Sequence, residues 1–245
     1  PAAPVNPPPA PPLGFGPALG PDGWFHLVWV WRDSPDAAAN HDLSYARSRD
    51  LVHWTRSDGT PLPLPIRLGD SEIVDAVPVR GGMINNNTVA GFDARGRVLI
   101  VFHKFDAAGD TQLFVARREA KGWRIVQASA WKGFRWDFGG TGSLDFRLRL
   151  GVATAEGKTL KLPVVRDGKP IDLLLDGETL GRLGERTGAS LANRLAGKIA
   201  VPAGMQLNSV EDESGVAIAW TTLPPNRDLP RDDVPEASVL RLVIP

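Results

Sequence analysis

The chain has 245 residues, 42% of them apolar, and its 28 basic and 28 acidic side chains balance at pH 7. This length and composition predict a folded chain with a sizeable core, and the balanced charge excludes the broad positive field that holds nucleic acid or an anionic membrane. The absence of cysteine excludes disulfides and thiolate metal sites, and no apolar run approaches the roughly 20 residues of a membrane-spanning helix.

Proline dominates residues 1–13, PAAPVNPPPAPPL. Because proline lacks a backbone N–H, this segment is predicted to be an extended or disordered lead outside any sheet. A propeller-like domain is expected over residues 14–245. The chain opens on Pro1 without a Met or a charged-then-apolar leader, so we expect a processed or truncated product.

A unit that occurs twice, at residues 22–54 and 95–123, is the most informative feature of the sequence. Each copy reads as a turn, an apolar strand, a polar loop, a second strand and a tight turn ending in Trp. Matching positions carry the same residues: Gly23 and Gly96, Asp33 and Asp106, and the pairs Ala46-Arg47 and Ala116-Arg117. Such β-rich copies are typical of a radial β-repeat, so the predicted fold class is an all-β propeller of four-stranded antiparallel blades.

Apolar residues fill both faces of the first strand, residues 24–32, with Phe25, Leu27, Trp29 and Trp31 on one of them. This pattern predicts a strand buried on both sides. We expect Trp29, Phe102 and Trp123 to be buried between sheets. Further strands are predicted at 159–166, 171–175, 216–222 and 238–244, which gives roughly three to four blades, and helical periodicity is weak except near 187–197.

Two connecting segments contain recognisable turn chemistry. Ser48, Asp50 and Trp54 in SRDLVHW resemble a shortened form of the turn that closes sialidase-like blades, in which Asp accepts backbone amides and Trp packs between sheets. The connection 57–93 contains GGMINNNT. It is interpreted either as a plain link between blades or as a polar loop that presents Asn85, Asn86 and Asn87 to a hydroxyl-rich ligand.

Four segments in order resemble the bacterial BNR-4 repeat proteins: HLVWVWRDSPDAAANHDLSYARSRDLVHWTRSDGTPLPLPI, GGMINNNTVAGFDARGRVLIVFHKFDAAGDTQLFVARRE, FRWDFGGTGS and AIAWTTLPPNRDLPRDD. The resemblance covers most of the chain from about residue 14. It implies a seven-bladed propeller, related to polysaccharide lyases that act on uronate-containing glycans such as ulvan and rhamnose-capped arabinogalactan. It also implies a secreted or periplasmic protein. Because the family has further blades ahead of Phe25, we expect this chain to be truncated at its N-terminus.

Elimination across a uronate needs a base, an acid and a cation that neutralises the carboxylate. Histidine can exchange a proton near neutral pH, and arginine can hold a carboxylate through two parallel hydrogen bonds. The predicted catalytic set is therefore His41 and His103, which lie where strands meet loops, Tyr45, expected on the same strand face as His41 and Leu43, and Arg135 as the carboxylate clamp. The predicted substrate-binding residues are Asn87, Lys104, Gln112 and Trp136, the last as a sugar-stacking platform.

Structural interpretations stand beside these roles. A lone His at a strand end is more often structural, as His26 and His53 are interpreted here, and Tyr45 could be a packing residue. Arg135 and Trp136 could form a cation–π pair that holds a loop. No metal motif is present and no cofactor is predicted, although a single calcium held by backbone carbonyls remains an open alternative.

Three classes of function follow, all with an acidic polysaccharide or oligosaccharide as the expected partner and without nucleic acid or membrane. The first is a uronate polysaccharide lyase. The second is a glycoside hydrolase, for which Asp42, Asp75 and Asp145 are candidate carboxylates. The third is a propeller that binds glycans without chemistry. Self-association is also expected if the propeller is incomplete, because exposed blade faces and edges would then pair.

Overall fold

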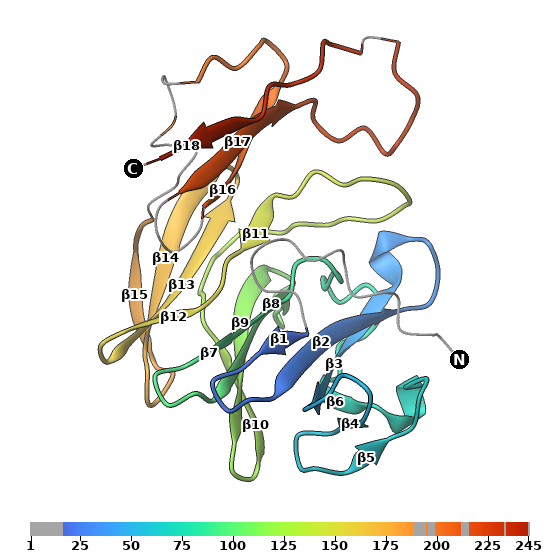
Figure 1. The fold of residues 1–245 in the computed structure, drawn as a ribbon, viewed down its shortest axis with the longest axis vertical. Helices are drawn as coiled ribbons and strands as arrows, with labels where there is room; N and C mark the ends of the chain where they lie inside the picture. The colour runs from blue at the N-terminus through green and yellow to red at the C-terminus, as the bar shows by residue number, and fades with distance from the viewer. Residues whose placement is uncertain (1–16, 189–194, 196–198, 212–215, 233, 245) are drawn as a thin grey trace. The chain divides into compact units, whose positions relative to one another are not determined.

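The computed structural model describes residues 17–188, 195, 199–211, 216–232 and 234–244. The proline-rich lead and most of the weak helical period near 187–197 lie outside these residues. The described residues form antiparallel sheets with two short 3-10 helices (Figure 1), so the all-β prediction is confirmed. No helix in this part of the chain is long and apolar enough to cross a membrane.

The chain divides into two compact units. The first comprises the described residues up to 140 together with 147–187, and the second comprises 141–146 with the described residues from 188 onward.

A six-stranded sheet opens the first unit, in the order β1-β2-β3-β4-β5 with β6 paired to β3. Its strands are β1 (Ala18–Leu19), β2 (Phe25–Arg32), β3 (Asn40–Ser48), β4 (Trp54–Thr55), β5 (Pro61–Leu62) and β6 (Glu72–Asp75). The 3-10 helix η1 (Ala37–Ala39) joins β2 to β3, and η2 (Leu68–Asp70) precedes β6. As predicted, β2 is buried on both faces: Trp29 and Trp31 pack in one core cluster, and Val28 and Val30 in another.

The second sheet has four strands in the order β10-β9-β8-β7. These are β7 (Val89–Phe92), β8 (Val98–Phe105), β9 (Thr111–Glu119) and β10 (Gly122–Gln127). One core cluster joins it to the first sheet, since Val30 and Leu43 pack with Ile100 and Phe102. Trp29 and Phe102 are buried as predicted, whereas Trp123 is only partly buried and packs against the edge of this cluster.

The two copies of the repeat share one strand register. Leu27 pairs with Ala46 in the first copy, and Ile100 pairs with Ala116 at the matching place in the second. Gly23 and Gly96 both have a φ of 74°, in the left-handed region that favours glycine. Within the paired strands, the first copy has one extra residue, Asp42, at a β-bulge.

The bulge changes the neighbours of His41. Trp31 pairs with His41, just as Lys104 pairs with Gln112 in the second copy. His41 therefore occupies the place of Gln112 and points to the face of Trp31, opposite to Leu43 and Tyr45. The prediction that His41, Leu43 and Tyr45 share a face is wrong, because it assumed uninterrupted alternation.

The blade-closing turn has the predicted hydrogen bonds. The Asp50 Oδ1 accepts from the backbone N–H groups of Val52 and His53 at 2.9 and 2.8 Å, and the Ser48 hydroxyl accepts from that of Leu51 at 2.9 Å. The Trp54 ring packs against the core cluster of Trp29 and Trp31. This motif thus stabilises the fold.

Two further sheets complete the described residues. The third, in the first unit, consists of β11 (Leu148–Leu150), β12 (Thr154–Glu156), β13 (Thr159–Arg166), β14 (Lys169–Asp176) and β15 (Arg182–Thr187). The fourth, in the second unit, consists of β16 (Gln206–Glu211), β17 (Ala217–Thr222) and β18 (Arg241–Val243). Four sheets agree with the predicted three to four blades, although they have six, four, five and three strands instead of a uniform four.

Candidate functional site

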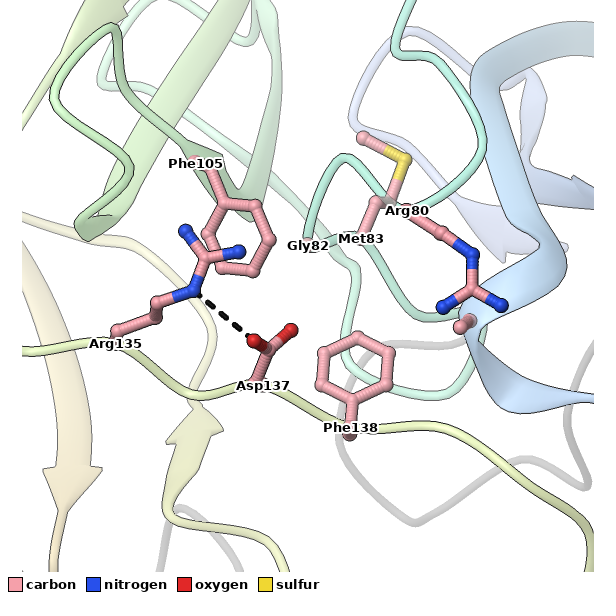
Figure 2. A pocket seen from close by; sticks show the side chains of 8 residues that line it. Arg80, Gly82, Met83, Phe105, Arg135, Asp137 and Phe138 are labelled. Atoms are coloured by element: carbon pink, nitrogen blue, oxygen red, sulfur yellow. Dashed lines mark hydrogen bonds and ion pairs between the residues drawn. The ribbon is translucent and has the colours of Figure 1, made fainter.

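A hollow of about 200 Å³ lies in the first unit, where three loops and the end of β8 meet (Figure 2). It is lined by Ala38 of η1, by Arg80, Gly82 and Met83 of the loop before β7, by Phe105 at the end of β8, and by Arg135, Asp137 and Phe138. The two copies of the repeat thus supply Ala38 and Phe105, the connection between them supplies Arg80, Gly82 and Met83, and the segment after β10 supplies the rest.

Short hydrogen bonds hold the three loops together. The Asp36 Oδ1 accepts from the backbone N–H groups of Ala38 and Gly140, at 2.9 and 2.6 Å. The Ala37 N–H donates back to the Gly140 carbonyl at 2.8 Å, and the Arg80 N–H donates to the Ala38 carbonyl at 2.9 Å. The loops that carry the lining side chains are therefore fixed by backbone contacts.

Gly82 makes room for an aromatic wall of the hollow. Its φ is 80°, and a Cβ atom at this position would lie 2.7 Å from the Phe105 ring. The Phe105 N–H donates to the neighbouring Gly81 carbonyl at 2.8 Å. Only glycine allows the loop to lie this close to the ring.

Alternation in FRWDF decides which side chains line the hollow. Phe134 and Trp136 are buried, whereas Arg135 and Asp137 between them are exposed, as expected for an extended segment. Backbone bonds to Thr111 fix the segment beside β9: the Thr111 N–H donates to the Phe134 carbonyl at 2.7 Å, and the Trp136 N–H donates to the Thr111 hydroxyl at 2.8 Å.

Arg135 is oriented by three contacts. Its Nε lies 3.1 Å from the Asp137 Oδ2, its Nη1 donates to the Gly109 carbonyl at 2.6 Å, and its guanidinium lies 4.0 Å from the centre of the Phe105 ring. The cation–π partner is therefore Phe105, not Trp136 as the structural alternative supposed. The remaining N–H groups of the guanidinium have no partner among the described residues.

Arg80 lies across the hollow from Arg135, with Asp137 and Phe138 between them in this view (Figure 2). Its side chain is 76% exposed, and the nearest carboxylate oxygen, on Asp36, is 3.9 Å away. Two cations and two aromatic rings thus surround one space, in which Asp137 is the only carboxylate among the lining residues. This arrangement is chemically suited to a small anionic group with an apolar face.

His103 lies next to the hollow but does not line it. It is 1% exposed and packs against Trp136 and Phe138, with ring centres 5.3 and 6.3 Å away. Burial lowers the pKa of His103 to about 4, although the nearby Gly82 backbone acts in the opposite direction. Neither ring nitrogen has a partner within hydrogen-bond geometry. The imidazole is therefore neutral at physiological pH.

His41 and Tyr45 are separate from this hollow and from each other. The His41 Nδ1 lies 3.0 Å from the Asp42 Oδ2, and its Nε2 lies 3.2 Å from the Asp33 Oδ1. The Tyr45 hydroxyl lies 2.7 Å from the His26 Nδ1, and burial raises the pKa of Tyr45. The structure does not bring the four predicted catalytic residues together.

A hydrogen-bonded Asp–His–Tyr network, in which the His and Tyr are buried and the Asp is exposed, was missed from the sequence. The His26 Nε2 lies 3.1 Å from the Asp22 Oδ1, and both His26 and Tyr45 are 1% exposed. Burial lowers the pKa of His26, although Asp22 opposes this change. The hairpin register could have revealed this contact, because it places Tyr45 opposite Val28 and diagonal to His26 on one face of the sheet.

Among the predicted substrate-binding residues, Asn87 and Gln112 are already engaged. The Asn87 amide donates to the Leu148 carbonyl at 2.9 Å and accepts from the Leu150 N–H at 3.1 Å. The Gln112 amide bonds Asp106, Ser129 and both backbone groups of Trp131. Both amides hold strands and loops in place, and both are buried, at 5% and 1% exposed, so neither is presented to a sugar hydroxyl.

Lys104 and Trp136 also have protein partners. The Lys104 Nζ lies 2.6 Å from the Asp75 Oδ2, and Trp136 is 4% exposed, so its ring is no open stacking platform in this structure. The aromatic surface of the hollow comes instead from Phe105 and Phe138. Within the described residues, no cluster of three or more His, Cys, Asp or Glu side chains could hold a metal ion.

Residues 15–131 match the sequence model of the BNR repeat-containing family. The predicted family resemblance is confirmed. The matched BNR segment holds the two repeat copies and every lining residue from Ala38 to Phe105, whereas Arg135, Asp137 and Phe138 follow it. No curated protein matches the chain.

Solved structures of two polysaccharide lyases match the chain at low sequence identity. An ulvan lyase of polysaccharide lyase family PL25, bound to -[GlcA(1-4)Rha3S]-, is 10% identical with a TM-score of 0.52 over 93% of this chain and 50% of that chain. The polysaccharide lyase Uly1 is 13% identical with a TM-score of 0.47 over 91% of this chain and 44% of that chain. The chain spans about half the length of these neighbours or less.

Proposed function

We propose that the chain is part of a carbohydrate-active propeller that binds an acidic polysaccharide at the hollow of Arg80 and Arg135. The observation that carries this proposal is the placement of these two arginines, from different loops, around one space with the rings of Phe105 and Phe138. A uronate offers a carboxylate for a guanidinium and apolar C–H faces for an aromatic ring.

The proposed reaction of the whole protein is β-elimination across a uronate. Arg135 would neutralise the substrate carboxylate, because its guanidinium is held in place and still has N–H groups to donate. His103 would act as the base that takes the proton α to the carboxylate, since a neutral imidazole is the form that accepts a proton. The bond from the β-carbon to the glycosidic oxygen would then break, and the leaving oxygen would take a proton from water. This role requires the side chain of Phe138 to move and uncover His103. Export to the periplasm or the cell exterior is part of the proposal.

A propeller that binds glycans without chemistry is the second candidate. The burial of His103 and Tyr45 favours it, as does the engagement of His41 by two aspartates. Glycoside hydrolysis has less support because it normally uses two carboxylates that flank the bond, whereas the hollow has only Asp137. Of the earlier candidates, Asp42 bonds His41 and Asp75 bonds Lys104, and Asp145 belongs to the second unit.

The test is to incubate the chain with uronate polysaccharides and to follow both binding and near-ultraviolet absorbance. Elimination leaves an unsaturated uronate that absorbs in the near ultraviolet. A rise in absorbance with the wild type, and none with Arg135→Gln, supports the lyase. If the wild type binds the glycan without a rise in absorbance, and Arg135→Gln weakens this binding, the binding propeller is supported. New reducing ends without absorbance would mean hydrolysis, and an absence of binding to every acidic glycan would overturn the proposal.

A further inference from the structure

A second hollow, of about 330 Å³, lies on the other side of the FRWDF segment, also within the first unit. It is lined by Trp131, Lys132, Gly133, Phe134, Arg147, Arg166 and Asp167. Arg166 ends β13, where it pairs with Leu148 of β11, and the Asp167 N–H donates to the Arg147 carbonyl at 2.7 Å. The third sheet and the residue before it therefore supply the two arginines, and the segment after β10 supplies the aromatic rings and Lys132.

The cations of this hollow differ in their partners. Arg147 is engaged, because its Nε and Nη2 bond the two Asp167 oxygens at 2.7 and 3.1 Å and its Nη1 donates to the Arg135 carbonyl at 3.0 Å. Arg166 has no ion pair in the part of the chain that the structure describes, and exposed Lys132 has none there either. Two positive charges without an ion pair thus line a space whose only lining carboxylate is already paired. Two further carboxylates, of Asp110 and Glu185, lie beside the hollow and accept from the Gly133 N–H and the Trp131 indole N–H at 3.1 and 3.3 Å.

Arg166 is held by stacking. Its guanidinium lies 4.6 Å from the centre of the Trp131 ring and 5.5 Å from that of Phe134. Stacking covers the flat faces of a guanidinium and leaves the N–H groups along its edge free to donate. Arg135 has the same arrangement on Phe105 in the first hollow. Each hollow thus contains one guanidinium that is oriented by an aromatic ring and can donate to an anion.

The two hollows are adjacent. The Arg135 side chain lines the first, while the carbonyl of the same residue bonds Arg147, which lines the second. Trp131 and Arg135 are four residues apart, and an extended chain of that length spans at most about 14 Å. One polysaccharide chain a few sugars long can therefore reach both.

We infer that the second hollow binds another acidic sugar of the same polysaccharide chain, with Arg166 and Lys132 donating to its carboxylate or sulfate ester. This inference rests on the proposed function of the first hollow. It predicts that affinity rises with the length of the acidic glycan, because a short ligand fills the first hollow and a longer one reaches the second.

The first experiment is calorimetric titration with a β-1,4-linked oligoglucuronate, as a dimer and as an octamer. Arg166→Gln and Lys132→Gln should each weaken octamer binding by about tenfold or more, since a charge-assisted hydrogen bond is lost, and should leave dimer binding unchanged. Arg135→Gln should weaken both. Arg124→Gln and Lys121→Gln are matched controls, because both residues are exposed and lack described ion pairs. Unchanged octamer affinity in Arg166→Gln and Lys132→Gln overturns the inference.

The second experiment does not depend on the first hollow. Sodium glucuronate and sodium sulfate are each titrated while the Trp131 indole N–H resonance, assigned with Trp131→Phe, is followed by NMR. A saturable shift in the wild type that is absent in Arg166→Gln supports an anion site. The salt that saturates the shift at the lower concentration shows whether the site prefers a carboxylate or a sulfate. If no oligoglucuronate binds but this shift is present, the proposed function fails and the anion site stands. If glycan binds and no shift is present for either salt, the inference fails and the proposed function stands.

Melting curves test whether Arg166→Gln is folded. If it is not, Lys132→Gln replaces it in both experiments, because the Lys132 side chain is exposed.

Discussion

At the scale of single residues, the burial of His103 makes the stability of the first unit depend on pH. Its ring is enclosed by apolar and aromatic side chains beside the first hollow, and burial lowers its pKa to about 4 from 6.5. Between these pH values the unfolded chain binds a proton at this position and the folded chain does not. Stability therefore falls as the pH is lowered through this range.

The expected loss from His103 is roughly 3 kcal/mol between pH 6.5 and pH 4. Urea unfolding at a series of pH values measures it, and His103→Leu should flatten this part of the profile. His53→Leu is the control, because His53 is 85% exposed, and it should keep the slope. An equal slope in the wild type and His103→Leu would show that His103 does not titrate in this way.

Gly82 provides a second test at this scale. Gly82→Ala adds a Cβ atom 2.7 Å from the Phe105 ring at a φ of 80°, so both overpacking and backbone strain should destabilise the protein by about 2–4 kcal/mol. Gly59→Ala, with a φ of 94° and no atom within 4 Å, should show only the backbone part. Chemical denaturation compares the two, and equal losses would mean that the contact with Phe105 is not tight.

At the scale of elements, the repeat explains much of what the sequence predicts and also where prediction fails. Gly23 and Gly96 allow the strand pairs to be aligned, and the observed registers match that alignment. The bulge at Asp42 is a local insertion that alternation does not reveal, so the face of His41 was predicted wrongly. Arg80 was missed because its place depends on contacts of a long connection with Ala38, far away in sequence.

His41 and Gln112 occupy matching positions, and each contacts the aspartate that follows the preceding strand. His41→Gln is therefore expected to preserve the fold, with a melting temperature within about 4 °C of the wild type, and to preserve glycan binding. If the protein proves to be a lyase, product formation should survive as well. A folded variant that binds glycan but no longer forms product would identify His41 as catalytic.

At the scale of the whole molecule, the second unit exposes large apolar side chains on and beside its edge strand β18. Leu240, Leu242 and Ile244 are 66%, 64% and 70% exposed, and Ile218, which pairs with Leu242, is 41% exposed. An edge strand with an apolar face is prone to pair with another chain. Self-association at this strand is therefore expected.

Sedimentation velocity over a range of protein concentrations should show concentration-dependent association. Leu242→Glu should weaken it by placing a charge on the exposed face. Val52→Glu is the matched control, since Val52 is equally exposed but lies in a turn of the first unit, and it should leave association unchanged. A monomer at every concentration would contradict the prediction.

The first hollow is proposed to recognise an acidic glycan through Arg80 and Arg135. The most direct measurement is calorimetric titration of oligoglucuronate into the wild type, Arg80→Gln, Arg135→Gln and the control Arg124→Gln. Loss of one charge-assisted hydrogen bond should weaken binding by about tenfold or more in each of the first two variants, with the larger loss for Arg135, whose guanidinium is already oriented by Phe105. If the wild type binds oligoglucuronate and both Arg80→Gln and Arg135→Gln bind it with the same affinity, the proposed recognition is contradicted.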